Sequence, residues 1–175
     1  MVLYRNGAVT GDDWVLVEDA APLPEAGPVA VTKKRWQAEH ETLLARDTPL
    51  GVILTAGENL DGITGALAHL SLIVLRLPKF SDGRPYSLAR LLRDRYGYKG
   101  ELRAAGDVLR DQIGFLARAG FDAFEVSHPG TIAALAEGRV HRFRHHYQPS
   151  SAPTDEGLPG PRPWLRVSPA AGAPS

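Results

Sequence analysis

The segment LSLIVLRLP, residues 70–78, decides the fold class of this chain. Its apolar side chains would face both sides of an extended strand. Strands that are buried on both faces are typical of parallel sheets covered by helices. We therefore predict that residues 70–78 form a central strand of a parallel sheet.

Strand-like and helix-like segments alternate on both sides of this central strand. The other expected strands are residues 28–32, 49–56, 100–106, 121–127 and a last, exposed strand at 139–149. The expected helices are residues 33–47, 59–70, 85–96, 107–120 and 130–138. Thr32 and Asp107 are expected to cap helix N-termini, and Gly97 and Gly120 to end helices.

This alternation predicts an α/β fold with a mainly parallel sheet and right-handed crossovers. Whether the sheet is an open one or a partial barrel stays open at this stage. Neither a G-x-G-x-x-G fingerprint after the first strand nor a P-loop is present. A dinucleotide site of the usual kind is therefore not expected.

The two ends of the chain have their own patterns. Asn6-Gly7 predicts a tight turn within an N-terminal β-hairpin, which we place in residues 1–20. Residues 1–147 are expected to form one α/β domain. Residues 148–175 contain seven of the 14 prolines, so we predict a disordered tail. It is either dispensable or a docking peptide around residues 162–167.

Composition restricts the function. The chain has 175 residues, 20 of them basic and 20 acidic, and no cysteine. The zero net charge argues against nucleic-acid binding, and the missing thiols exclude thiolate chemistry and thiolate metal sites. No apolar run reaches the ~20 residues of a membrane helix, and no signal peptide is apparent. We therefore expect a cytoplasmic protein that does not associate with membranes.

Polar residues follow the predicted strands where ligands bind in parallel α/β proteins, outside the carboxyl ends of the strands. We expect these residues to share one rim. They are Gly57, Glu58, Asp82, Gly83, Arg84, Tyr86, Gly106, Asp107, Arg110, Asp111, Glu125, Ser127 and His128.

Asp82-Gly83-Arg84 is the most specific candidate on this rim. Glycine allows its two charged neighbours to point to the same side, and a guanidinium can hold an oxyanion through two parallel hydrogen bonds. The start of the following helix would add amide dipoles. These features predict binding of a small anion. The structural alternative is that Asp82 caps the helix while Arg84 pairs with an acid.

Arg90 and Arg103 are further ligand-binding candidates. Arg103 lies within a predicted buried strand, so we favour pairing with Asp107, Asp82 or Glu125 over contact with a ligand. Asp107 is a candidate general base, although capping a helix is its simpler role.

The histidines do not predict a metal site. His141 and His145 would share one face of the last strand, with His146 beside them, but no acidic ligand pattern accompanies them. We interpret this basic segment as an exposed edge strand, or else as a contact for an acidic partner.

The segment from Phe80 to Phe124 resembles a bacterial family of unknown function that is commonly encoded beside assimilatory sulfite reductase. Some of its members are labelled oxidoreductases probably involved in sulfite reduction. The layout of residues 1–149 is similar throughout. The residues that match the family motif are Asp82, Gly83, Arg84, Ser87, Arg90, Gly106, Asp107 and Asp111.

The resemblance implies a role in sulfite reduction, and we expect an accessory protein that binds an anionic ligand or components of the reductase itself. The alternative is an enzyme, an oxidoreductase among the kinds considered, acting on a small anionic metabolite at the rim. In that case Arg84 would hold the anion and Asp107 would move a proton. The sequence identifies no cofactor, and it leaves the oligomeric state open.

Overall fold

The computed structural model describes residues 1–79 and 81–139 of the chain. Its strands are β1 (Val2–Arg5), β2 (Ala8–Thr10), β3 (Val15–Val17), β4 (Val29–Thr32), β5 (Leu50–Leu54), β6 (Leu70–Leu77), β7 (Glu101–Gly106) and β8 (Ala123–Val126). Its helices are α1 (Lys33–Leu44), the 3₁₀ helix η1 (Thr64–His69), α2 (Arg84–Arg90), the π-helical turn η2 (Leu91–Arg95), α3 (Ile113–Ala119) and α4 (Pro129–Ala136). The predicted strand at 139–149, its histidines and the predicted tail at 148–175 lie outside the described residues, apart from residue 139.

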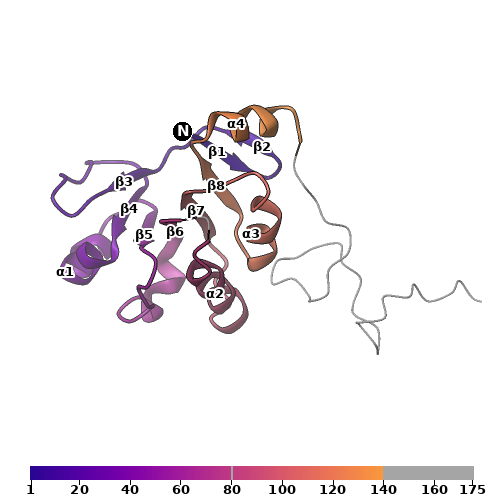
Figure 1. Cartoon of the computed structure of the whole chain (residues 1–175). Helices are drawn as coiled ribbons and strands as arrows, with labels where there is room; N and C mark the ends of the chain where they lie inside the picture. The colour runs from indigo at the N-terminus through magenta and orange to yellow at the C-terminus, as the bar shows by residue number, and fades with distance from the viewer. Residues whose placement is uncertain (80, 140–175) are drawn as a thin grey trace, which may run out of the picture.

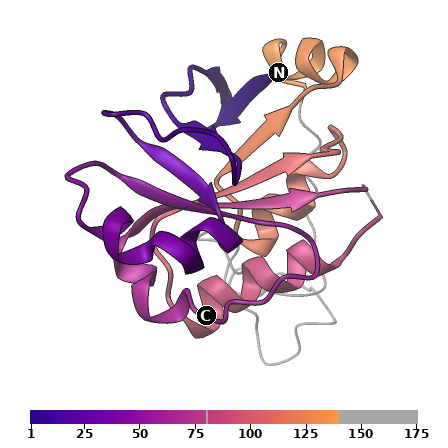
Figure 2. The same cartoon turned by 90° about the vertical axis from the view of Figure 1, so that its left-hand side faces the viewer.

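The eight strands form one sheet in the order β2-β1-β8-β7-β6-β5-β4-β3. Strands β3 to β8 are parallel and follow one another in chain order, whereas β1 is antiparallel to both β2 and β8. Right-handed crossovers between sequential neighbours place the connecting helices on the same side of the sheet. Figure 2 shows α1 and α2 on one side of the twisted strands, and Figure 1 shows the strands running in an arc from β3 to β2. The predicted α/β fold with a mainly parallel sheet is confirmed.

The sheet is curled into an open half-barrel, and the short link between β2 and β3 explains why. These two strands are seven positions apart in the sheet order, yet only residues 11–14 join them. Seven strand spacings of a flat sheet span about 34 Å, whereas five residue steps reach at most about 18 Å. The two edges must therefore approach each other.

Each face of the sheet has its own apolar cluster. The larger one lies on the helix face and joins strand residues such as Leu54 and Leu75 to the helices. The smaller one lies on the opposite, inner face, where Trp14 from the link and Leu16 cover it. All five residues of β5 are buried, which explains the continuous apolar pattern of that segment.

Capping residues and glycines in the sequence correctly predicted several helix ends. The Thr32 side chain accepts a hydrogen bond from the N–H of Arg35, as expected of the N-cap of α1. Gly97 and Gly120 have φ angles of 61° and 110°, the left-handed conformation predicted for them. The predicted helix at 85–96 corresponds to α2 and η2 together, and the weak helical pattern at 59–70 corresponds to η1.

Two predictions need correction. The helix expected at 107–120 begins only at Ile113, so Asp107 does not cap it. Gly106 has a φ angle of 105° and the Asp107 N–H donates to the Leu77 carbonyl, which turns the chain back over β6 before the helix starts. The hairpin expected in residues 1–20 spans only β1 and β2. Residues 15–17 form β3, at the other edge of the sheet.

Candidate functional site

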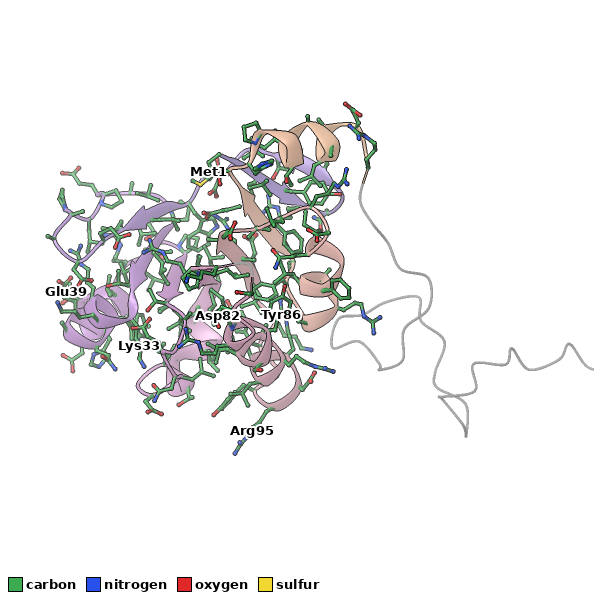
Figure 3. The ribbon with its side chains drawn as sticks, viewed as in Figure 1. Met1, Lys33, Glu39, Asp82, Tyr86 and Arg95 are labelled. Atoms are coloured by element: carbon green, nitrogen blue, oxygen red, sulfur yellow. The ribbon has the colours of Figure 1, made fainter. Side chains whose placement is uncertain are left out.

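The carboxyl ends of β5 to β8 bring the predicted rim residues to one edge of the sheet. Leu77 at the end of β6 pairs with Gly106 at the end of β7, so the segments that follow these two strands start side by side. In Figure 3, Asp82 and Tyr86 lie together near the start of α2, and Arg95 projects from the far end of the same helical segment. The segments that follow these strands therefore share one rim, but Glu125 does not belong to it, because it lies within β8 and pairs with the buried Arg103.

A pocket of about 370 Å³ opens at this rim between the β5–η1 loop and the beginning of α2. Its apolar wall comes from strand ends and helix, namely Leu54, Leu75, Leu88 and Leu91. Its polar groups come mainly from the loop and from Arg84. Pockets with a mostly apolar lining and a few polar groups are typical of small-molecule sites.

Only part of the predicted set reaches this pocket. Gly57, Glu58 and Arg84 line it, together with Ser87, whereas Asp82 and Asp107 do not. Asp82 acts on the pocket through its hydrogen bonds to Arg84, whereas the pocket lining includes no residue of the segment after β7. The sequence therefore predicted the edge of the sheet correctly, but not which of its residues share a cavity.

Asp82 holds one side of the Arg84 guanidinium. Arg84 Nε lies 3.0 and 3.2 Å from the two carboxylate oxygens of Asp82, and Nη2 lies 2.7 Å from Oδ2. These hydrogen bonds lower the pKa of Asp82 and raise the pKa of Arg84. The Arg84 N–H also donates to Asp82, at 3.0 Å. The structural alternative, in which Arg84 pairs with an acid, is therefore part of the arrangement.

Three of the first four residues of α2, all except Tyr86, have no amide donor available to a ligand. The N–H of Arg84 is taken by Asp82, Pro85 has no N–H, and Ser87 donates to the Gly83 carbonyl. The helix itself has only seven residues. The guanidinium of Arg84 is therefore the principal cationic group of α2 that faces the pocket.

Arg84 reaches across the pocket to Gly57 in the β5–η1 loop. A Cβ atom on Gly57 would lie 2.9 Å from Arg84 Nη1, and the φ angle of Gly57 is 98°. A side chain at Gly57 would thus be strained and would also displace the guanidinium. Within residues 1–79 and 81–139, Nη1 makes no hydrogen bond of its own, so it can donate to a bound group.

Two sets of hydrogen bonds shape the β5–η1 loop. Glu58 Oε2 accepts from the N–H of Thr55 at 2.6 Å and from its hydroxyl at 2.8 Å. Lys33 Nζ donates to the Asn59 carbonyl at 2.9 Å and to its side-chain oxygen at 2.6 Å. The Lys33 residue is only 8% exposed, so a buried ammonium anchors the loop that faces Arg84.

Sequence reasoning missed Lys33 and Asn59. Lys33 directly follows β4 and therefore lies at the same rim as the predicted residues. Applying the strand-end argument to β4 as well would have found it. Asn59 carries no comparable signal, because its role depends on a contact with a residue 26 positions away.

Tyr86 and Asp111 bring the segment after β7 against α2. Burial raises the pKa of the Tyr86 hydroxyl, and the nearby Asp111 charge raises it further. Gly106 leaves no room for a side chain, since a Cβ atom would lie 2.4 Å from the Leu77 carbonyl oxygen. Arg90 belongs to the last turn of α2, where its Nε lies 3.9 Å from Asp94.

Arg103 lies on the inner face of the sheet, away from the rim pocket. Its side chain is fully buried and forms ion pairs with Asp12 at 2.7 Å, Glu101 at 2.9 Å and Glu125 at 3.2 Å. Burial alone would lower the pKa of Arg103, but its hydrogen bonds to Asp12 and Glu101 raise it overall. The predicted pairing with Glu125 is confirmed, and Asp12 and Glu101 are additional partners.

Known protein families offer one point of comparison. The family model described as "Bacterial protein of unknown function (DUF934)" matches residues 51–156, which is more than half of the chain. The residues that line the pocket all lie within this range. A search of curated proteins found no match.

Residues 1–79 and 81–139 contain no group of three or more histidine, aspartate or glutamate side chains placed to hold a metal ion. None of the helices in this part of the chain is long and apolar enough to cross a membrane.

Proposed function

We propose that this chain, which belongs to the bacterial family DUF934, is an accessory protein of assimilatory sulfite reduction that binds an anionic group at Arg84. The metabolic setting comes from the family resemblance. The binding chemistry comes from one observation: Arg84 is oriented by Asp82 through Nε and Nη2, while Nη1 faces a pocket above Gly57.

The way in which Asp82 occupies only some of the guanidinium donors supports anion binding by the others. A guanidinium has five N–H donors in a fixed plane, and Asp82 occupies only the edge formed by Nε and Nη2. The remaining donors are held in place without a further loss of side-chain entropy when a ligand arrives. Asp82 is thus a positioning residue, and Arg84 is the group that contacts the anion.

The matched variants Arg84→Ala and Arg95→Ala test the proposal. Arg95 is an exposed arginine of the neighbouring turn that does not line the pocket. We expect Arg84→Ala, but not Arg95→Ala, to slow growth on sulfate as the sulfur source. Normal growth of the Arg84→Ala strain, with the variant protein folded and present, would remove Arg84 from any essential role.

Association with the reductase is the second part of the proposal. A pull-down with tagged full-length protein should capture components of sulfite reductase from cells grown on sulfate. A deletion strain with normal reductase activity and no captured component would contradict this part. The anion site of Arg84 would then have to serve another process.

The alternative is an enzyme that acts on a small anionic metabolite, and the arrangement after β7 favours it as a second candidate. Asp107 begins the segment that carries Asp111, and the Asp111 charge acts on the hydroxyl of Tyr86, which lies in α2 two residues after Arg84. Native purification followed by mass analysis of co-purifying molecules would identify a substrate. Turnover that is abolished by Asp107→Asn would favour the enzyme.

A further inference from the structure

The pocket at Arg84 is much larger than an inorganic oxyanion. With about 30 Å³ for one water molecule, an ion of four or five heavy atoms occupies roughly 120–150 Å³. The pocket has a volume of about 370 Å³. An ion bound to Arg84 alone would leave most of this space to water against leucine side chains. The volume therefore fits a larger, organic ligand.

The charges of the pocket also argue against a purely ionic ligand. The Arg84 side chain is 64% exposed and already paired with Asp82. Arg76 and Glu58 also line the pocket, but Arg76 is paired with Glu18, and the Glu58 carboxylate is hydrogen bonded to Thr55. An exposed pair of this kind contributes about a fivefold change in affinity at most. Useful affinity must come mainly from apolar contact.

The apolar wall is built to supply that contact. Leu54 and Leu75 belong to strand ends, and Leu88 and Leu91 belong to the helix opposite them. Leu88 and Leu91 are only partly buried, so a ligand would remove more of their surface from water. Arg84, at the start of the same helix, provides the polar end of the cavity.

We infer that the ligand of this pocket is an amphipathic organic anion, with a single carboxylate, sulfonate or phosphate group on Arg84 and an apolar body of several carbons against the leucine wall. This inference rests on the proposed anion site and specifies its ligand class. It predicts that inorganic sulfite is not the molecule this pocket selects.

A homologous series of n-alkyl sulfonates, from methanesulfonate to octanesulfonate, tests the inference by calorimetric titration of the full chain. Each methylene that enters an apolar site should tighten binding about fourfold. We expect this increase to continue along the series until the pocket is filled. Inorganic sulfite, as a probe of the head group alone, should bind no more tightly than methanesulfonate.

Two variants distinguish the contribution of the ligand's anionic head group to affinity from that of its apolar body. Arg84→Gln should weaken every sulfonate by about the same factor, roughly fivefold, without changing the dependence on chain length. Leu88→Asn should weaken octanesulfonate by more than about fourfold and leave methanesulfonate unchanged. Arg95→Gln and Leu44→Asn are matched controls, because both residues are exposed and neither lines the pocket.

The outcomes distinguish this inference from the proposed function. Sulfite binding that is tighter than octanesulfonate binding and that depends on Arg84 would overturn the inference but support the anion site. Sulfonate binding that does not change with chain length would likewise overturn the inference and support the anion site. If no probe binds at millimolar concentration, both the inference and the anion site are wrong. The chain-length series on the unmodified protein tests the inference even if a variant fails to fold.

Discussion

Two arginines of this protein, Arg103 and Arg84, have opposite surroundings. Arg103 is fully buried on the inner face of the sheet and contacts three carboxylates, whereas the Arg84 side chain is 64% exposed at the rim and contacts one. A buried guanidinium with three acidic partners has no access to a ligand. An exposed one with a single partner keeps donors for other groups.

Burial and the number of acidic partners distinguish a structural arginine from a ligand-binding one, although the residue type is the same. Arg103 connects β7 to β8 through Glu125 and to the β2–β3 link through Asp12. It thus fastens the link that crosses the inner face of the curled sheet. Arg84, in α2, lies beside Gly57 of the β5–η1 loop, at the pocket proposed for the ligand. Four substitutions, arranged below by the size of their expected effects, test this comparison.

Removal of the buried charge should have the largest effect. Arg103→Met would leave Glu101, Glu125 and Asp12 close together without the buried cation between them, with Arg5 pairing only with Glu101. Breaking a buried ion pair by removing one partner typically costs about 3–5 kcal/mol in the free energy of unfolding. We expect a loss in that range from urea unfolding curves. Arg84→Met is the matched control and should cost much less, because solvent screens its exposed charge pair. Similar losses for the two variants would contradict the comparison.

The link across the inner face should show the next largest effect. Asp12→Ala removes two hydrogen bonds to the Arg103 guanidinium, of 2.7 and 3.0 Å. Hydrogen bonds to charged groups contribute about 1.5–3 kcal/mol, so we expect a loss of about 2 kcal/mol. Its neighbour Asp13 is also exposed, and Asp13→Ala should change stability by less than about 0.5 kcal/mol. Equal effects of the two substitutions would show that Asp12 does not fasten the link.

These two sites also show what the sequence could and could not reveal. The strand pattern of residues 70–78, the cap at Thr32 and the stop at Gly120 depend on neighbouring residues, and all three were predicted correctly. The pairing of Arg103 with some acid followed from the high energy of an unpaired buried charge. Its partner Asp12 did not follow, because the two residues are 91 positions apart.

The candidate site shows the same limit. The rim could be predicted because parallel strands place their carboxyl ends together, whatever the details of packing. The cavity could not, because it depends on how the β5–η1 loop folds over α2. The contact between Lys33 and Asn59 that anchors this loop joins two segments on either side of β5. The delayed start of α3 likewise depends on a hydrogen bond from Asp107 to β6.

A substitution at Gly57 tests whether Arg84, the exposed arginine of the comparison, needs its observed position at the rim. Gly57→Ala places a side chain on a backbone with a φ angle of 98° and directs it at Arg84 Nη1. Backbone strain of this kind costs about 1–2 kcal/mol. We expect a stability loss of that size together with weaker binding of octanesulfonate. Gly83→Ala is the control, because Gly83 has a helical φ angle and open space around it. Unchanged binding in Gly57→Ala would mean that Arg84 does not need its observed position.

The smallest effect should be the pH dependence of the Asp82–Arg84 pair. The hydrogen bond from the Arg84 side chain lowers the pKa of Asp82 below its ordinary value of 3.8. The folded state therefore binds this proton more weakly than the unfolded state does. The stabilisation is present above the unfolded pKa and is lost as the pH falls through the lower, folded pKa. Both groups are accessible to water, so solvent screening keeps the contribution small.

Asp82→Asn removes this titration and isolates its contribution. The difference in the free energy of unfolding between the unmodified protein and Asp82→Asn should be constant from about pH 6 to about pH 5 and should decrease below about pH 4. Urea unfolding at each pH measures it, since other carboxylates titrate alike in both proteins. A difference that stays constant down to pH 3, or that grows, would show that Asp82 is not selectively bound in its charged form. Arg84 would then lack the fixed orientation on which the proposed anion site depends.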